Sequence, residues 1–445
     1  MKKIINLLTA AFLLSAASMV FAVDKKNDAP DKADFISVKG THLSLKGSNY
    51  YVVGTNMWYG GYLGSAGKIG DRNRLITELD NLKAIGINNI RVLAVSEAAA
   101  HNSAIRPATT SAFGKHDEDL LAGLDFFMAE IAKRDITAVI YLNNFWQWSG
   151  GMTQYMSWIE GKPAPDPNVD GNWEGFAAQS AKFYQSKKAN DEYRKTIKKI
   201  VTRVNTITGK SYIDDPAILS WQLANEPRAG NWKTTDKEKS IYVKWINDTA
   251  KYIHSLDTNH MVSTGAEGLM GAMNDEKLYI DAHSSPYVDY LTYHMWVRNW
   301  GWYEQKKPEQ TWDNAVTKGK EYLNAHIDIA KKMNKPIVLE EFGLDRDMGS
   351  YDVKSSTRYR DKFYRIVFDT VYNRTKAGDP IVGFNFWAWN GAARTTQPNH
   401  WWHAGDDFMG DPPQEEQGMY GVFDSDISTI LIIKEYADKM HALPK

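Results

Sequence analysis

The sequence predicts an α/β fold of the (β/α)8 TIM-barrel type, and three observations lead to this prediction. Eight short apolar runs alternate with amphipathic helical stretches along the chain. The chain has 445 residues, 43% of them hydrophobic, which is enough to bury one large core. Polar or aromatic residues directly follow almost every apolar run, and a barrel gathers its functional side chains at such positions.

The start of the chain is typical of a signal peptide. A positive MKK start is followed by an apolar stretch over residues 4–20, and Ala22 ends a small-x-Ala cleavage pattern. The alternative is an uncleaved membrane anchor. Residues 23–33 are charged and contain proline, which indicates a flexible lead-in, and 34–445 form the predicted catalytic domain. We therefore expect a secreted or periplasmic protein with no transmembrane segment in the mature chain.

The predicted elements follow one another in barrel order. A small β-hairpin is expected over residues 35–51, with turn signals at Lys39-Gly40 and Lys46-Gly47. The eight barrel strands are predicted at residues 51–54, 89–93, 136–142, 218–223, 261–264, 290–294, 336–341 and 382–387. Helices are predicted at residues 72–85, 117–134, 174–207, 236–256, 312–333, 357–376 and 428–440. No internal repeat or appended binding module is visible.

Composition excludes several classes of protein. The formal net charge is −1 and no basic stripe is present, so a nucleic-acid partner is not expected. Cysteine is absent, which excludes disulfides, thiolate metal sites and a cysteine nucleophile. Alternation alone also allows a doubly wound open sheet, but no glycine-rich nucleotide loop follows the first strand. The 16 tryptophans often stand in clusters beside Asn, His and Glu, and flat aromatic faces of this kind stack against pyranose rings.

The strand ends carry the candidate functional residues. They are Asn56, Trp58, Arg91, Asn143, Asn144, Asn225, Glu226, Glu267, His294, Trp296, Glu341 and Trp387. Two of them, Glu226 and Glu341, end strands four and seven, on opposite sides of a barrel mouth. Hydrolysis of a glycosidic bond needs two such carboxyl groups, and a separation of about 5 Å suits the retaining mechanism. Glu340 competes with Glu341, because adjacent strand residues point to opposite faces and only one of them is expected to enter the site.

Metal-binding interpretations are weaker. The loop with His400, His403, Asp406 and Asp407 could bind a metal, but such residues in a long loop more often form hydrogen bonds. The acidic stretch 166–170 lacks the ligand spacing of a calcium loop and is interpreted as a turn. We expect no metal and no cofactor.

Several motifs resemble glycoside hydrolase family five of clan A. Asn225-Glu226-Pro227 at strand four and Glu341-Phe342-Gly343 at strand seven resemble the paired signatures of that family. Further stretches, GTNMWYGGYL at 54–63, LNNFWQWSGGMTQY at 142–155 and YHMWVRNW at 293–300, are similar to its β-1,4-mannanase branch. The resemblance covers about residues 35–441.

The resemblance implies a role for each matching residue. Glu226 would be the acid/base and Glu341 the nucleophile, which decides between Glu340 and Glu341. Asn225 would hold the sugar 2-hydroxyl, Arg91 would lie near the nucleophile, and His294 and Trp296 would line the site. Many family members have tyrosine where Trp296 stands. Trp387 would be the stacking platform, Arg228 an aglycone contact, and Trp58 and Asn143 further substrate-binding residues.

These observations lead to one principal hypothesis and two alternatives. The principal hypothesis is a retaining endo-β-1,4-mannanase acting on mannan, glucomannan or galactomannan. We expect a monomer whose partner is its polysaccharide substrate. The first alternative is an exo-acting mannanase or a cellulase on the same barrel, since insertions at 145–173 and 391–420 could block one end of the cleft. The remote alternative is a non-catalytic carbohydrate-binding barrel.

Overall fold

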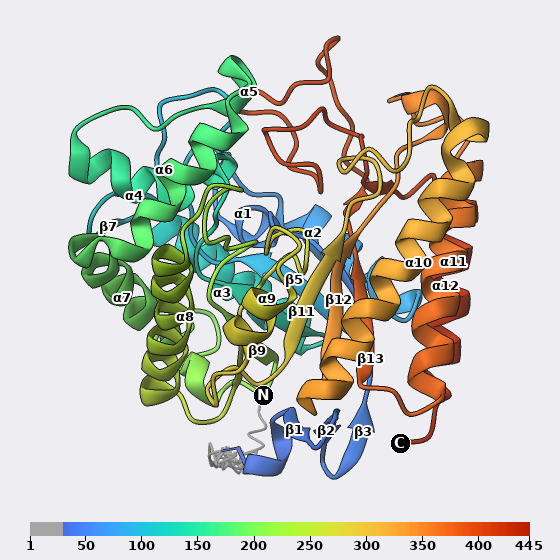
Figure 1. Cartoon of the computed structure of the whole chain (residues 1–445), viewed down its shortest axis with the longest axis horizontal. Helices are drawn as coiled ribbons and strands as arrows, with labels where there is room; N and C mark the ends of the chain where they lie inside the picture. Colours follow the sequence, from blue (N-terminus) through green and yellow to red (C-terminus); the bar gives the residue numbers. More distant parts are fainter. Residues whose placement is uncertain (1–29) are drawn as a thin grey trace, which may run out of the picture.

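The computed structural model describes residues 30–445 (Figure 1). The predicted signal peptide at residues 1–22 lies outside this range, as does most of the predicted lead-in. In the described part of the chain, no helix combines the length and the apolar character that a membrane crossing requires.

Eight parallel strands form the barrel. They are β4 (Val52–Asn56), β5 (Asn89–Leu93), β8 (Thr137–Tyr141), β9 (Ile218–Gln222), β10 (Met261–Ser263), β11 (Leu291–Met295), β12 (Ile337–Phe342) and β13 (Ile381–Phe386). The hydrogen-bonded order is β10-β9-β8-β5-β4-β13-β12-β11. A parallel bridge between Ser263 and Tyr290 joins the two ends of this sheet and closes the ring. The predicted (β/α)8 barrel is confirmed, and each strand lies within a few residues of its predicted position.

Helices surround the barrel, as Figure 1 shows for α8, α10, α11 and α12. The helices of this layer are α2 (Arg72–Ala84), α3 (Glu118–Ala132), α6 (Trp173–Gln185), α7 (Lys187–Val201), α8 (Asp236–Leu256), α9 (Glu276–His283), α10 (Pro308–Met333), α11 (Arg358–Lys376) and α12 (Ile427–His441). Helix α9 was not expected from the sequence. Their inward-facing apolar residues form one continuous core with the strands.

The single helix predicted over 174–207 is wrong in two respects. Ser186 leaves the helical conformation, and its hydroxyl accepts a hydrogen bond from the amide of Ala189, so it caps the start of α7. Helix α7 ends at Val201, and Arg203 and Asn205 then bond to Asp125 of α3. These polar side chains stabilise a turn rather than a further helical turn.

A small antiparallel sheet covers the amino-terminal end of the barrel. It has three strands, β1 (Ser37–Lys39), β2 (His42–Leu45) and β3 (Ser48–Tyr50), where the sequence predicted a hairpin. Both turn signals form turns, which adds the third strand. Leu43 packs into an apolar cluster with the first residues of the barrel strands, such as Val52 and Val338. The sheet therefore closes the bottom of the barrel (Figure 1).

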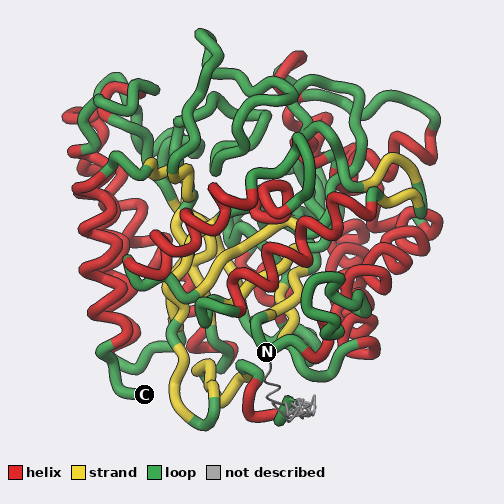
Figure 2. Tube along the Cα trace, turned by 180° about the vertical axis from the view of Figure 1, so that it is seen from behind, coloured by secondary structure: helices red, strands yellow, loops and turns green. Residues whose placement is uncertain are grey.

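The opposite end of the barrel is covered by long loops, which Figure 2 shows gathered above the strands. They contain α1 (Gly60–Gly64), α4 (Gly151–Glu160), α5 (Pro167–Asp170) and the antiparallel pair of β6 (Thr110–Ala112) and β7 (Lys115–His116). Short strands β14 (Trp389–Gly391) and β15 (Val422–Phe423) pair at the base of the longest loop, residues 392–421. This end of the barrel carries the predicted site.

Candidate active site

A cavity of about 610 Å³ lies at the carboxyl ends of the barrel strands. Six of the ten residues to which the family resemblance gives a role line it, as does the strand-end candidate Glu267; the six are Asn225, Glu226, Arg228, Trp296, Glu341 and Trp387. Arg91 and His294 are fully buried and contact the two catalytic-candidate carboxylates from inside the barrel. The structure thus brings eight of the ten predicted residues together.

The backbone at Glu226 is in a conformation that side-chain-bearing residues rarely adopt. Its φ is +49°, in the left-handed region. Strand β9 ends four residues earlier, and the amide of Glu226 donates to the carbonyl of Gly265 over 2.8 Å. The amide of Asn225 likewise donates to Asn143 over 2.9 Å. Neighbouring strand ends therefore hold this turn in place, and strain retained in this way is common at functional sites.

The Glu341-Phe342-Gly343 segment has a packing explanation. Phe342 points outward into an aromatic cluster with Tyr364 and Phe368, which anchors the end of β12 in the core. A Cβ atom at Gly343 would lie 2.8 Å from the carbonyl oxygen of Trp387. Glycine is needed here because the chain approaches the backbone of the next strand end so closely. Together they fix Glu341 on the cavity side.

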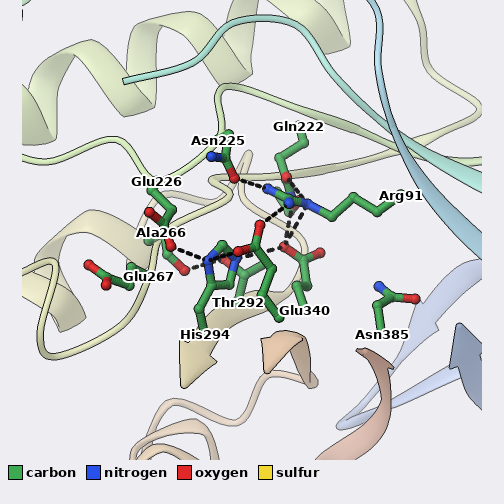
Figure 3. A network of polar contacts seen from close by, with 12 residues as sticks. Arg91, Gln222, Asn225, Glu226, Ala266, Glu267, Thr292, His294, Glu340 and Asn385 are labelled. Carbon is green, nitrogen blue, oxygen red and sulfur yellow. Dashed lines mark hydrogen bonds and ion pairs between the residues drawn. The ribbon is translucent and has the colours of Figure 1, made fainter. Parts of the chain in front are cut away.

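Glu226 and Glu341 face each other with His294 between them. One carboxylate oxygen of each and one ring nitrogen of His294 all lie within 4.8 Å of one another. His294 Nδ1 lies 2.6 Å from Glu226 Oε1 and 3.3 Å from Glu341 Oε2. The approach of the two carboxylates agrees with the predicted separation of about 5 Å. Figure 3 shows the ring of His294 between the side chains of Glu226 and Glu340.

Arg91 of β5 organises the floor of the site. Its Nη1 donates to Glu341 and its Nη2 donates to Asn225 Oδ1 over 2.7 Å. Its Nε donates to Gln222 Oε1 over 2.8 Å, and its guanidinium lies 4.6 Å from the centre of the Tyr141 ring. The guanidinium is fully buried, so its charge acts on Glu341 with little screening by water.

Glu340 also approaches Arg91, although it does not line the cavity. Its Oε2 accepts from Gln222 Nε2 over 2.7 Å and lies 3.7 Å from Arg91 Nε. The register between β11 and β12 shifts here, so that Tyr293 pairs with Leu339 while His294 pairs with Glu341. Glu340 is the extra residue of this bulge, and a bulge changes the direction of neighbouring side chains. Both glutamates can therefore approach one arginine.

The pKa values of His294, Glu226 and Glu341 are shifted in different directions. Burial opposes a charge on His294, but the carboxylates of Glu341 and Glu226 outweigh burial and raise the pKa of His294 to about 9. Burial would raise the pKa of Glu226, yet the hydrogen bond and charge of His294 lower it to about 2. Burial raises the pKa of Glu341 to about 7, against the opposing charges of His294 and Arg91. Without substrate, the imidazolium therefore keeps Glu226 ionised and leaves Glu341 as the more basic carboxylate.

Arg228 and Glu267 form an ion pair beside Glu226. Arg228 Nη2 donates to Glu267 Oε2, and its guanidinium lies 4.7 Å from the centre of the Trp146 ring. Trp146 Nε1 donates to Glu226 Oε2 over 2.5 Å. Burial raises the pKa of Glu267 to about 7 although Arg228 opposes this rise. These groups make the wall of the cavity on the side of Glu226.

Aromatic rings make the opposite wall. Trp296 and Trp387 pack edge to face, with ring centres 5.9 Å apart. Tyr420 from the loop after β13 packs on Trp296 at 5.1 Å, and its hydroxyl donates to Asn299. A tyrosine is thus present beside Trp296, but its hydroxyl points to Asn299. The partner of Glu341 here is Arg91.

Trp58 and Asn143 do not line the cavity, in contrast to the prediction. Trp58 is 1% exposed, and its Nε1 donates to the carbonyl of Gly410 over 2.9 Å. The 392–421 loop folds over it, with Phe408 packed edge to face on its ring. Asn143 is fully buried, and its Oδ1 accepts from the amide of Asn144. Both residues stabilise strand ends around the site.

A contact between two loops closes one side of the cavity. Asn168 of α5, in the loop after β8, donates from Nδ2 to the carbonyl of Gln414 over 2.7 Å. Gln414 belongs to the loop after β13. Strands β5 and β4 lie between β8 and β13, so this contact passes above their ends. Figure 1 shows α5 against the red loop at the top of the molecule. The cavity is covered on the β4–β5 side.

The cluster of Glu226, His294 and Glu341 has the donor atoms of a metal site. Metal ligands must be deprotonated, however, and the raised pKa of His294 favours the protonated ring. Arg91 adds a second positive charge against Glu341. The electrostatics fit a pair of working carboxylates better than a divalent cation. In the 392–421 loop, Asp406 accepts hydrogen bonds from Gln397 and from the amide of His403, which gives this carboxylate a structural role.

A (β/α)8 barrel with two buried glutamates facing each other at strand ends four and seven defines a glycoside hydrolase. The sequence model of the family described as "GH family 5 beta-mannosidase-like" matches residues 33–445, and the chain belongs to this family.

Known relatives agree with this assignment. Mannan endo-1,4-beta-mannosidase 1 of Arabidopsis thaliana is 28% identical over 330 residues, covering 71% of this chain and 72% of the relative. Mannan endo-1,4-beta-mannosidase 4 of Solanum lycopersicum is 30% identical over 288 residues, covering 62% of this chain and 65% of the relative.

Solved structures are also similar. The glycoside hydrolase family 5 mannosidase from Rhizomucor miehei superposes with a TM-score of 0.85 at 32% identity, covering 93% of this chain and 99% of that one. A mutant of that enzyme has been solved in complex with mannosyl-fructose. The endo-1,4-beta-mannanase from the same organism has a TM-score of 0.65 at 20% identity, a similarity of fold.

Several cavity residues were not predicted from the sequence. Trp146, Trp173, Arg298 and Glu415 line the cavity and come from loops after β8, β11 and β13. Trp146 stands two residues after the strand-end Asn144, and the Trp-rich stretch around it was a signal for a sugar site. No local signal indicated Glu415, because its position depends on the path of the whole 392–421 loop.

Proposed function

We propose that this protein is a retaining endo-β-1,4-mannanase that hydrolyses β-1,4-mannosidic bonds of mannans, with residues 34–445 as its catalytic domain. One observation carries the proposal: Glu226 and Glu341 approach within 4.8 Å in a cavity lined by tryptophans. This separation leaves no room for a water between the carboxylates and the anomeric carbon, which favours the retaining route. The names of the plant relatives support mannan as the substrate.

In the first step, a Glu341 oxygen bonds to the anomeric carbon while the bond from that carbon to the leaving oxygen breaks. Glu226 gives its proton to the leaving oxygen. In the second step, Glu226 takes a proton from water, the water oxygen bonds to the anomeric carbon, and the ester to Glu341 breaks. Trp387 provides the ring on which the reacting sugar stacks, and Asn225 holds its 2-hydroxyl.

The proton must first reach Glu226. Free of substrate, Glu341 is the more basic carboxylate, whereas the reaction needs a proton on Glu226 and a charge on Glu341. His294 Nδ1 lies near both and provides a route. The imidazolium gives its Nδ1 proton to Glu226 and takes the proton of Glu341, which leaves His294 charged as before. Arg91 then stabilises the Glu341 carboxylate.

A second candidate is exo-acting cleavage on the same barrel. The Asn168–Gln414 contact covers the cavity on the β4–β5 side. A chain of sugars cannot continue through a covered side, so this arrangement favours removal of units from a chain end. The family description and the Rhizomucor miehei mannosidase also support this candidate.

We also propose export to the periplasm or the medium, because residues 1–22 have the pattern of a signal peptide. A polymeric substrate outside the cell is consistent with this location. Expression of the full chain and N-terminal sequencing of the exported protein test the cleavage after Ala22. Retention of residues 1–22 on a membrane-bound product would contradict this proposal.

The function is tested by hydrolysis of galactomannan, glucomannan and carboxymethyl-cellulose by the wild type and by Glu341→Ala. We expect mannan activity in the wild type and a loss of at least about 10⁴-fold in the variant, since the nucleophile is removed. Glu309→Ala, at an exposed glutamate of α10, is the matched control. Activity confined to cellulose would contradict the substrate, and activity retained by Glu341→Ala would contradict the site.

The product profile from mannohexaose distinguishes the two candidates. Endo action gives a mixture of short oligosaccharides at early times. Exo action gives one small product that accumulates linearly from the start. Stereochemistry is read by NMR within the same reaction: the first-formed product has the β configuration if the mechanism is retaining.

A further inference from the structure

Two tryptophans lie exposed beside the candidate active site. Trp173, the first residue of α6, is 45% exposed, and Trp232, in the loop after β9, is 62% exposed. Within residues 30–445 they are the only tryptophans among the large exposed hydrophobic side chains. An indole contributes a large apolar area, and leaving it in water forgoes its packing energy. Two such residues on one rim indicate a binding surface.

Trp173 continues the wall of the cavity outward. Trp146 donates its Nε1 hydrogen to Glu226, and the rings of Trp146 and Trp173 are 5.9 Å apart and nearly perpendicular. Trp173 itself lines the cavity. An aromatic path therefore begins at the proposed acid/base and reaches the molecular surface.

The loop carrying Trp232 is attached to the start of α6. Asn231 Nδ2 donates to the carbonyl of Glu174 over 3.0 Å, which places the residues next to Trp173 and Trp232 in direct contact. The Asn231 side chain also accepts from the amide of Lys233 over 2.9 Å and forms a tight turn. Trp232 stands inside this turn, so its backbone is held although its side chain is exposed.

The position of this rim relative to the reaction identifies its occupant. The proposed acid/base protonates the leaving oxygen, so the leaving part of the substrate lies on the side of Glu226. The other side of the cavity is covered by the Asn168–Gln414 contact. The leaving part of a long substrate therefore extends over the rim next to β9, where Trp173 and Trp232 lie.

We propose that Trp173 and Trp232 form a platform that binds the leaving-group part of a β-1,4-linked mannan chain, beyond the cavity itself. This inference rests on the proposed function. The apolar faces of successive sugar rings stack on the two indoles, and their hydroxyl groups remain in water. The platform gives the enzyme a preference for substrates whose leaving-group part is long.

The test compares a long and a short substrate. We would measure kcat/KM for mannohexaose and for 4-nitrophenyl β-mannoside, whose leaving group is too short to reach Trp232, with the wild type, Trp232→Ala, Trp232→Phe and Trp173→Ala. Leu431→Ala is the control, because Leu431 of α12 is 60% exposed and lies on a helix outside the cavity lining.

We expect Trp232→Ala to lower kcat/KM for mannohexaose by about threefold to tenfold, the size of one lost aromatic stacking contact. Its activity on the nitrophenyl substrate is unchanged, and Trp232→Phe restores most of the activity on mannohexaose. Trp173→Ala has an effect at least as large on mannohexaose. The loss appears in KM rather than in kcat.

Equal activity of Trp232→Ala and the wild type on mannohexaose would overturn this inference and leave the proposed function intact. A parallel loss on both substrates would also overturn it, since the substitution would then act on the cavity itself. A wild type inactive on every mannan and mannoside would overturn the proposed function and this inference together.

Discussion

The two ends of the barrel are made from the same eight strands but differ in chemistry. At the amino-terminal end, Val52, Leu219 and Val338 meet the small β1–β3 sheet through Leu43 in a hydrophobic cluster. At the carboxyl-terminal end, Arg91 and His294 are buried among four glutamates. Burying apolar groups stabilises the fold, whereas burying charges opposes it unless each has a partner. The comparison indicates that the amino-terminal end stabilises the fold, whereas the charges buried for catalysis at the carboxyl-terminal end reduce its stability.

The largest effect is expected from removing the charge of Arg91 at the carboxyl-terminal end of the barrel. In Arg91→Met, Glu340 and Glu341 lose their common guanidinium and remain buried. We expect a loss of about 3–5 kcal/mol in the free energy of unfolding, the usual result of breaking a buried ion pair. The pKa of Glu341 rises further above about 7, so kcat/KM at neutral pH falls at least about a hundredfold.

Chemical denaturation and mannan hydrolysis measure both quantities for Arg91→Met. Arg365→Met is the control, because Arg365 pairs with Glu435 on the surface, where both side chains are more than a third exposed. Such pairs contribute about 0–1 kcal/mol. An Arg91→Met protein as stable as the control would show that the carboxyl-terminal end of the barrel tolerates unpaired carboxylates.

At the amino-terminal end of the barrel, we expect a substitution to lower stability without changing activity. Leu43→Ala removes a fully buried side chain from the apolar cluster and leaves a cavity, so unfolding should become easier by about 2–4 kcal/mol. The folded enzyme keeps its kcat/KM, because Leu43 contacts only the other end of the strands. Val38→Ala, on the exposed β1 strand, is the control for stability. A change in kcat/KM of folded Leu43→Ala would mean that the two ends are coupled.

The sequence predicts the strands well because barrel strands are buried on both faces and appear as short apolar runs. The polar residues at the strand ends then identify the carboxyl-terminal end of the barrel as the site. This pattern leads to Glu226, Glu341, Arg91 and His294. The split of 174–207 into α6 and α7 is harder, since Ser186 is one polar residue among many. The missed helix α9 spans only Glu276–His283, and a short pattern of this kind is weak evidence for a helix.

Loop residues are not predictable in the same way. Trp58 does follow the first strand, as the sequence indicates, but the 392–421 loop folds over it and removes it from the cavity. That loop also brings Glu415 and Tyr420 to the site from positions with no strand-end pattern. Such placements depend on contacts between loops far apart in sequence, for example Asn168 with Gln414. Local patterns contain no information about them.

The most selective expected effect is that of His294 on stability, because it depends on pH. The pKa of His294 rises from its usual value to about 9 on folding, so the folded protein binds one more proton than the unfolded chain between about pH 6.5 and 9. The stabilisation from this proton is complete below about pH 6.5 and is lost as the pH rises through 9. A shift of this size corresponds to about 3 kcal/mol.

Urea denaturation of the wild type and of His294→Asn at pH 6.5 and pH 9.5 measures this contribution. The free energy of unfolding of the wild type should fall more steeply over this interval than that of the variant. His283→Asn is the matched control: burial lowers the pKa of His283 to about 4, so its contribution rises between about pH 4 and 6.5 and is constant above. Parallel curves for the wild type and His294→Asn above pH 6.5 would mean that His294 is neutral between the two glutamates. The proton route from Glu341 to Glu226 would then be lost, while the expected effect of Leu43→Ala at the amino-terminal end of the barrel would not change.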